Sequence, residues 1–139
     1  MKRNIITLLI TVFAMLQATA QTYDNLWKQA DIIAQKDQPK SEIGVMKKII
    51  SKATVAKDYG QLLAAEIRQA ILWREISPDS LTPNVKRMET EALKAKDPVL
   101  KAVRYAVLGR VYREVNGKKS EEFFKKALEQ PELLARNAS

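Results

Sequence analysis

Helix-breaking residues divide the chain at fairly regular intervals, and the segments between them have helical periodicity. The breaks contain Pro, Gly, Asn, Asp and Ser, and they lie at residues 37–39, 58–60, 77–83, 97–98, 116–117 and 131. No window alternates apolar and polar residues over a sustained length, so no strand is expected. The sequence therefore predicts an all-α fold, with six helices at residues 23–36, 40–57, 61–76, 83–96, 98–116 and 120–130.

The third and fifth of these segments are apolar over most of their circumference, whereas the other four have one apolar stripe each. A helix that is apolar on all sides is covered by neighbours on several sides. We therefore expect residues 61–76 and 98–116 to be central, with Trp73 and Leu108 fully buried. Trp27, on the stripe of the first helix, is interpreted as a second core anchor. The short, polar fourth helix has its stripe at Val85, Met88, Ala92 and Leu93.

Two helix starts have capping signals. Asp97 is expected to cap the fifth helix, with Pro98 in its first turn, where the missing N–H costs nothing. Ser120, followed by two Glu residues, is expected to begin the sixth helix. The longest connection is predicted between Ser77 and Thr82, before Pro83.

The first, third and fifth helices begin roughly 37 to 38 residues apart, a spacing typical of helix-hairpin solenoids. The sequence Leu108-Gly109-Arg110-Val111-Tyr112 resembles the L-G-x-x-Y element of tetratricopeptide repeats. In that family the Gly lets the partner helix approach and the Tyr packs between the two helices. Phe124 and Ala127 resemble positions of the second helix. The first two pairs lack the Leu-Gly element, so we expect three degenerate antiparallel hairpins stacked as a tetratricopeptide-like α-solenoid.

The first twenty residues are interpreted as a signal peptide. Lys2 and Arg3 precede an apolar stretch from Ile5 to Leu16, and small residues then lead to a predicted cleavage site between Ala20 and Gln21. The stretch is shorter than the roughly 20 residues that span a bilayer, which disfavours an uncleaved anchor. We expect export to the periplasm or envelope of a Gram-negative-type bacterium, with the membrane involved only through this leader. Residues 21–139 would then form the helical module.

The charge balance does not predict a nucleic-acid partner. The chain has 24 Lys and Arg residues against 16 Asp and Glu, a net charge of +8. The basic residues are scattered over every segment, and the densest pairs lie near carboxylates or on amphipathic helices. A moderately basic surface is the simpler interpretation.

The inventory of reactive residues argues against an enzyme. The chain has no His and no Cys, which excludes a Ser-His-Asp triad, thiolate catalysis and the commonest metal ligands. The nearest approach to a phosphate-binding loop, Gly117-Lys118-Lys119-Ser120, has the wrong spacing. The Glu89 and Glu91 carboxylates, like those of Glu121 and Glu122, are interpreted as solvated. We predict no catalytic, metal or cofactor-binding residue and no small-molecule substrate.

One resemblance extends over residues 21–139. The predicted mature start is similar to the start of large bacterial alpha-2-macroglobulin-like proteins over Gln21-Thr22-Tyr23-Asp24-Asn25-Leu26-Trp27-Lys28-Gln29-Ala30. Four further pieces match the opening of that family in the same order. They are Ala56-Lys57-Asp58-Tyr59-Gly60-Gln61-Leu62-Leu63, then Ser77-Pro78-Asp79-Ser80, then Lys96-Asp97-Pro98-Val99 leading into Leu108-Gly109 and Tyr112, and finally Ala127-Leu128 with Pro131-Glu132-Leu133-Leu134-Ala135.

The resemblance implies a helical N-terminal segment of a parent protein that continues into β-sandwich domains and is associated with protease inhibition. The chain has no Cys for a thioester and no bait region, so no inhibitory residue is transferred to it. A helix that resumes after Pro131 and ends by Ser139 predicts a module truncated at its C-terminal end.

Two functional hypotheses result. The first is a non-catalytic, exported module at the start of an alpha-2-macroglobulin-like envelope protein, whose partner is the rest of the parent chain. The second is a stand-alone periplasmic adaptor that binds a protein or peptide in a concave groove.

Overall fold

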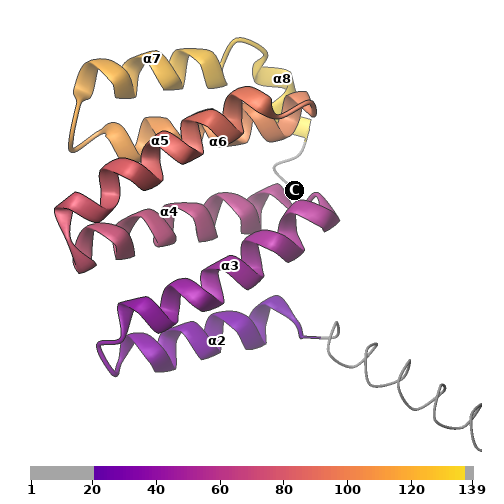
Figure 1. Cartoon of the computed structure of the whole chain (residues 1–139). Coiled ribbons are helices and arrows are strands. Elements are labelled where there is room, and N and C mark those ends of the chain that lie inside the picture. Colours follow the sequence, from indigo (N-terminus) through magenta and orange to yellow (C-terminus); the bar gives the residue numbers. More distant parts are fainter. Residues whose placement is uncertain (1–20, 137–139) are drawn as a thin grey trace, which may run out of the picture.

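The computed structural model describes residues 21–136, and it folds them into a stack of helices without a strand in that range (Figure 1). The predicted leader and Ala20 of the predicted cleavage site lie outside the described residues. The helices are α2 (Tyr23–Ala34), α3 (Pro39–Ala56), α4 (Tyr59–Ile76), α5 (Pro78–Lys94), α6 (Pro98–Tyr112), α7 (Gly117–Ala127) and α8 (Pro131–Arg136).

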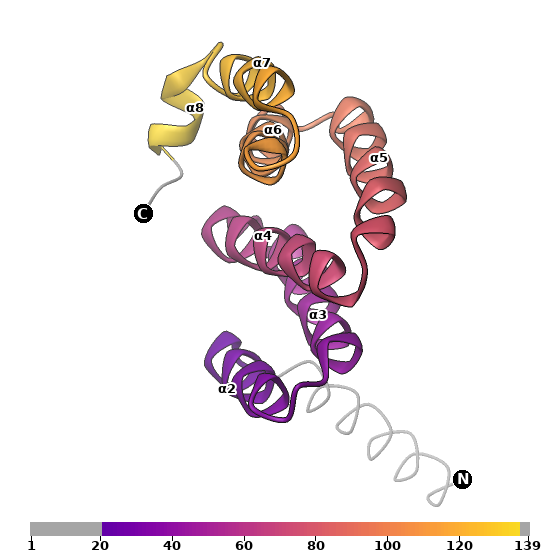
Figure 2. The same ribbon diagram turned by 90° about the vertical axis from the view of Figure 1, so that its left-hand side faces the viewer.

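Successive helices run antiparallel and are joined by short turns, which confirms the predicted all-α stack of helix hairpins (Figure 1). Seen nearly along the helix axes, α3 and α5 lie on one side and α2, α4 and α6 on the other (Figure 2). In Figure 1, α4 lies between α3 and α5 along the stack, and in both views α7 covers α6 at the far end. The described residues therefore form two staggered columns of helices.

The core confirms that α4 and α6 are central, and it adds α3 as an equal contributor. Among the largest fully buried side chains, Leu62 and Leu72 come from α4, and Leu108 and Val107 from α6. Met46 and Ile49 of α3 are just as inaccessible. Because α3 packs against α2 on one side and α4 on the other, it buries more than the single stripe that we expected.

Polar caps fix where the helices begin. The Asp97 carboxylate accepts hydrogen bonds from the N–H groups of Val99 (2.9 Å) and Leu100 (3.2 Å), which confirms the predicted cap of α6. Asp58 caps α4 in the same way, through the N–H of Gln61 at 3.2 Å.

The predicted start of the fourth helix at Pro83 is wrong. Helix α5 begins at Pro78, and Pro83 lies inside it. The Ser77 hydroxyl accepts a hydrogen bond from the Asp79 N–H at 3.2 Å, so the helix starts with a capping Ser and a first-turn Pro. Pro83 removes one helical hydrogen bond at an exposed position near the N-terminus. The expected connection from Ser77 to Thr82 is therefore almost entirely helix.

The predicted start of the sixth helix at Ser120 is also wrong. The Asn116 side chain caps α7 by accepting a hydrogen bond from the Lys119 N–H at 3.0 Å. Ser120 lies within the helix and is buried, and its hydroxyl donates to the Gly109 carbonyl oxygen at 2.7 Å. A Ser followed by acidic residues resembles a helix start, but here it joins two helices. The short α8 is an additional helix after Pro131.

Leu93 and Trp27 are less buried than predicted. The Leu93 side chain is 64% exposed, because the buried face of α5 consists of Leu81, Val85, Met88 and Ala92. Trp27 is only half-buried against the core, and its indole N–H donates to the Gln61 side-chain oxygen at 2.7 Å.

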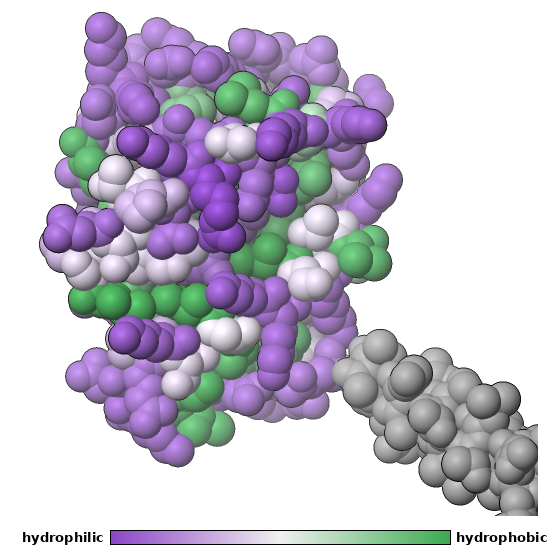
Figure 3. Space-filling view, in the orientation of Figure 1, coloured by the Kyte–Doolittle hydropathy of each residue, from purple (hydrophilic) through white to green (hydrophobic). Residues whose placement is uncertain are grey.

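The face that carries α3 and α5 is mostly hydrophilic (Figure 3). Hydrophobic residues form small separate areas on it, and the longest of these lies at the left-hand ends of α3 and α4. Within residues 21–136, no helix combines the length and hydropathy needed to cross a membrane.

Candidate functional site

The central helix α4 buries two polar side chains that face neighbouring helices instead of water, those of Glu66 and Gln69. Glu66 lies opposite Arg104 of α6, with 3.6 Å between its Oε1 and the Arg104 Nε, and its side chain is only 8% exposed. Its other oxygen, Oε2, and the Arg104 Nε are buried without a hydrogen-bond partner in the described residues. A buried carboxylate oxygen that lacks a donor is unusual, because such a group loses its hydration without compensation.

Burial raises the pKa of Glu66 to about 7. The neighbouring Glu91 carboxylate raises it further, while Arg104 and Arg87 lower it. The desolvation of the carboxylate outweighs the attraction of the two guanidinium groups. Glu66 therefore changes its protonation state near neutral pH, which an exposed Glu does not do.

Glu66 and Gln69 lie at the bottom of a cleft of about 400 Å³ between α3, α4 and α5. Its walls combine apolar and charged side chains. Ile50 and Met88 form the apolar part, and Arg87 and Glu91 of α5 face Lys47 and Ser51 of α3. Arg87 also lies over the Trp73 ring, with 5.6 Å between its guanidinium carbon and the ring centroid. Because the Glu66 Oε2 itself is buried, a donor in the cleft reaches it only if the side chains that cover the oxygen move aside.

A second groove, of about 760 Å³, lies on the other side of the same α3 residues. Lys47 and Ser51 belong to both hollows, and Lys48 and Lys52 continue along the second groove. Its apolar wall contains Leu26 of α2 and the C-terminal residues of α3. The two hollows thus flank one ridge of α3.

A smaller pocket of about 50 Å³ lies between α4, α5 and α6. Two cationic side chains, Arg74 and Arg110, pair with the single carboxylate of Glu114 at its edge. Because Glu114 already occupies both guanidinium groups, this pocket offers no unused charge.

Most of the residues predicted to pack the hairpins lie on α6 and α7, with Trp27 on α2 and Trp73 on α4. Leu108, Ala127 and Trp73 are buried. A Cβ atom added to Gly109 would lie 2.7 Å from the Phe124 ring, so the two helices approach as closely as this Gly permits. Phe124 is nevertheless 37% exposed at its outer side.

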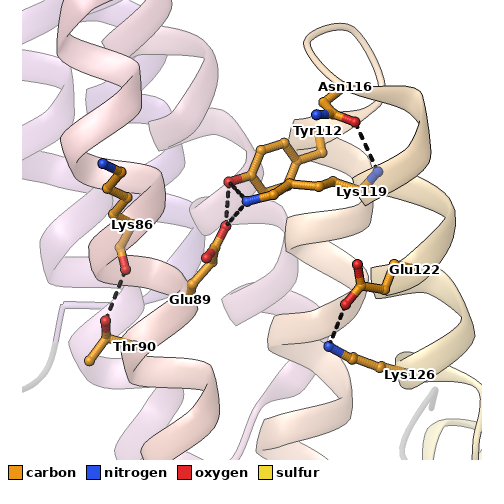
Figure 4. A network of polar contacts seen from close by, with 8 residues as sticks. All are labelled: Lys86, Glu89, Thr90, Tyr112, Asn116, Lys119, Glu122 and Lys126. Carbon is orange, nitrogen blue, oxygen red and sulfur yellow. Dashed lines mark hydrogen bonds and ion pairs between the residues drawn. The ribbon is translucent and has the colours of Figure 1, made fainter.

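Tyr112 packs between helices in a way that the sequence did not specify. Its ring stacks on Phe123, with ring centroids 5.6 Å apart and an angle of 6° between the rings. Its hydroxyl contacts Glu89 of α5 and Lys119 of α7, so one side chain links three helices (Figure 4). The predicted solvated role of Glu89 is therefore wrong, whereas Glu121 and Glu122 are exposed and pair with Lys125 and Lys126.

Sequence analysis missed Glu66, Gln69 and Phe123. A Glu within an otherwise apolar helix signals a buried ion pair, but the position of Arg104 on another helix depends on the tertiary packing. Within residues 21–136, no three acidic side chains gather as a metal site.

No protein-family model, curated protein or solved structure matches this chain. The relationship to alpha-2-macroglobulin-like proteins therefore stays a prediction that rests on the sequence pieces quoted above.

Proposed function

We propose that the chain is a non-catalytic helical module that docks another protein on the side of the stack formed by α3 and α5. The observation that carries the proposal is the cleft over α4, where a buried Glu66 oxygen lacks a donor. A partner that displaces the side chains covering this oxygen would place a side-chain or backbone N–H against it as the missing donor. The apolar contacts of Ile50 and Met88 would contribute the rest of the binding energy.

The sequence supports a binding role over a catalytic one. The chain has no His and no Cys, so acid–base and nucleophilic chemistry would depend on carboxylates and hydroxyls. Glu66 has a pKa suited to proton transfer, but its cleft also holds two cations and two apolar side chains. That mixture is typical of a protein contact, in which polar groups set the orientation and apolar groups add affinity.

The resemblance to alpha-2-macroglobulin-like proteins supports a hypothesis about the location of this module and the protein to which it belongs. It favours an exported protein of the bacterial envelope, where the helical stack begins a parent chain associated with endopeptidase inhibition. The partner at α3 and α5 would then be a later domain of that parent. The alternative is a stand-alone periplasmic adaptor, and the two separate hollows beside α3 favour it because they suit a peptide-sized ligand.

Site-specific photo-crosslinking in the cells that produce the protein tests the proposal. A benzophenone amino acid is placed at Ser51, which lines both hollows, and as a control at the exposed Lys118 of α7. We expect a discrete crosslinked protein from position 51 and none from position 118. No product from position 51, or the same product from both positions, would overturn the proposal.

The identity of the crosslinked product separates the two settings. A crosslink to β-sandwich domains of the same polypeptide supports the alpha-2-macroglobulin-like parent. A crosslink to a separate polypeptide supports the adaptor. Mass spectrometry of the crosslinked peptide distinguishes the two.

A further inference from the structure

The exposed charges of α3 all have the same sign. Its solvent-facing side carries Lys40, Lys47, Lys48 and the half-buried Lys52, and Lys57 follows at the C-cap. The only carboxylate of the helix, Glu42, is buried and holds Arg68 of α4 at 2.7 Å from its Oε1. None of the helix's own acidic residues is therefore left to neutralise these lysines.

Neighbouring helices provide little compensation, and the one carboxylate of α5 that shares a cleft with Lys47, Glu91, forms no ion pair with it. Within residues 21–136, Lys40, Lys47 and Lys48 form no ion pair and no hydrogen bond. Lys52 contacts only the Gln21 carbonyl oxygen and the Tyr23 ring, and Lys57 lies 3.8 Å from Asp97. By contrast, Lys125 and Lys126 of α7 each have a Glu four residues earlier at 2.8 Å.

The spacing of the α3 lysines adds repulsion. Lys48 and Lys52 are four residues apart, so their side chains are neighbours on the helix surface. Like charges in that arrangement destabilise a helix, and an anionic ligand would relieve the repulsion. The charge pattern of α3 therefore favours the complex with an anionic ligand over the free protein.

The groove beside these lysines indicates the kind of anion. Leu26, Val55 and Ala56 line it together with Lys47, Lys48 and Lys52, and Val55 is 85% exposed. Lys40 lies outside the groove, nearer the N-terminus of α3. The lining of the groove includes no Arg and no aromatic ring. Phosphate recognition favours Arg forks, and single-stranded nucleic acids are usually bound with the help of aromatic stacking. The groove therefore suits carboxylates with adjacent apolar residues better than either of these ligands.

We propose that the exposed face of α3 binds an acidic segment of a partner protein, whose carboxylates pair with Lys40, Lys47 and Lys48 and whose apolar side chains contact Val55. This inference rests on the proposed docking function and names the chemistry of the partner. A phospholipid surface or a nucleic acid would be a different ligand, and the test below includes both.

Fluorescence anisotropy tests the inference with the purified protein. The probe is a labelled synthetic peptide of repeated Glu-Glu-Leu units, and its matched control is the Gln-Gln-Leu peptide. One variant combines Lys40→Gln, Lys47→Gln and Lys48→Gln. The control variant, Lys94→Gln with Lys118→Gln and Lys125→Gln, loses the same charge on other exposed helix faces.

We expect the α3 variant to bind the Glu peptide about tenfold more weakly than wild type, because it loses three exposed ion pairs. The control variant should remain within about twofold to threefold, since only the long-range attraction falls. The Gln peptide should bind weakly to all proteins. Equal losses in both variants would overturn the inference, because bulk charge would then explain the binding.

Vesicles of phosphatidylglycerol and phosphatidylcholine, and a single-stranded oligonucleotide, are tested as competitors. Displacement of the Glu peptide by either one, with an affinity that depends on the same three lysines, would overturn the acidic-protein ligand. Failure of this inference leaves the proposed function intact if position 51 still gives its crosslink. Conversely, lysine-dependent peptide binding without that crosslink would refute the proposed docking function in cells.

Discussion

The α6–α7 contact and the α3 side of the stack use the same helix-hairpin architecture, but they differ in whether their polar groups have partners within the chain. Between α6 and α7, Gly109 allows Phe124 to approach, and the Ser120 hydroxyl bonds to the Gly109 carbonyl oxygen. The α7 lysines at 125 and 126 have carboxylate partners. On the α3 side, Glu66 keeps an oxygen without a donor, and the lysines of α3 face solvent without carboxylates.

Burial alone therefore does not distinguish a structural contact from a docking surface. Both regions contain buried polar atoms, but the contact between α6 and α7 satisfies its own through Ser120, whereas the contact between Glu66 of α4 and Arg104 of α6 does not. A contact that is complete within the chain contributes to stability. A buried polar group that lacks a partner lowers the stability of the free protein, and a ligand that supplies the partner restores it.

The largest expected change in stability comes from truncating a buried side chain of the α6–α7 hairpin. Leu108 is fully buried, so Leu108→Ala should lower the free energy of unfolding by about 2–5 kcal/mol through lost burial and a residual cavity. Leu93→Ala removes the same atoms from a 64% exposed position and should cost less than roughly 0.5 kcal/mol. Urea denaturation measures both. Equal costs would contradict the assignment of α6 as central.

The next effect concerns Glu66 and has a defined sign. Its folded-state pKa, about 7, is above the ordinary value of 4.5, so the folded protein binds this proton more tightly than the unfolded chain. The resulting stability is fully present below pH 4.5 and is lost as the pH rises through 7. The loss should be on the order of 3 kcal/mol, since each pKa unit corresponds to about 1.4 kcal/mol.

The neutral variant Glu66→Gln provides the control for that measurement. Its amide has nearly the same shape and cannot titrate, so the fall in stability between pH 5 and pH 8 should be much smaller than in wild type. Chemical denaturation at several pH values gives the comparison. An unchanged pH profile would show that other groups cause the dependence and that Glu66 is hydrated or paired.

The sequence predicted the fold better than the candidate site. Hydrophobic periodicity and helix-breaking residues predict the helices because both are local properties of the sequence. The apolar circumference of α4 and α6 predicts their central position. The two errors at Pro83 and Ser120 arose because a Pro can be tolerated near a helix start and a Ser can bond to another helix. Both outcomes depend on neighbours in space that the local pattern does not reveal.

The site could not be predicted for a similar reason. Glu66 and Arg104 are far apart in the sequence, and nothing near either residue indicates the other. The lysines of α3 were visible, but their lack of partners was not, because it depends on which carboxylates the fold brings near them. Sequence patterns describe the residues of one helix, whereas an unsatisfied group is a property of several helices.

A smaller effect is expected at two of the helical glycines, Gly109 and Gly44. Gly109→Ala adds a methyl group 2.7–2.9 Å from three atoms of the Phe124 ring and should cost about 1 kcal/mol net, because overpacking outweighs the helix propensity gained. Gly44→Ala on α3 has no atom within 4 Å of the new methyl group and should stabilise by about 0.5–1 kcal/mol. In a Phe124→Ala background, Gly109→Ala should become stabilising too. Thermal denaturation of the four variants measures these changes. If Gly109→Ala and Gly44→Ala changed stability in the same direction in the wild-type background, the close packing at Gly109 would not distinguish α6 from α3.

The smallest expected effects differ in sign between the two regions. Lys48→Gln removes one of two like charges four residues apart and should raise stability by about 0.2–0.5 kcal/mol at low salt. Lys125→Gln breaks the 2.8 Å pair with Glu121 and should lower stability slightly. Lys and Gln have similar helix propensities, so charge is the main difference in both variants. Melting temperatures at low and high salt provide the measurement, and both shifts should shrink as salt screens the charges. A loss of stability from Lys48→Gln would mean that α3 already has a carboxylate partner, and the contrast between a satisfied hairpin and an unsatisfied docking face would fail.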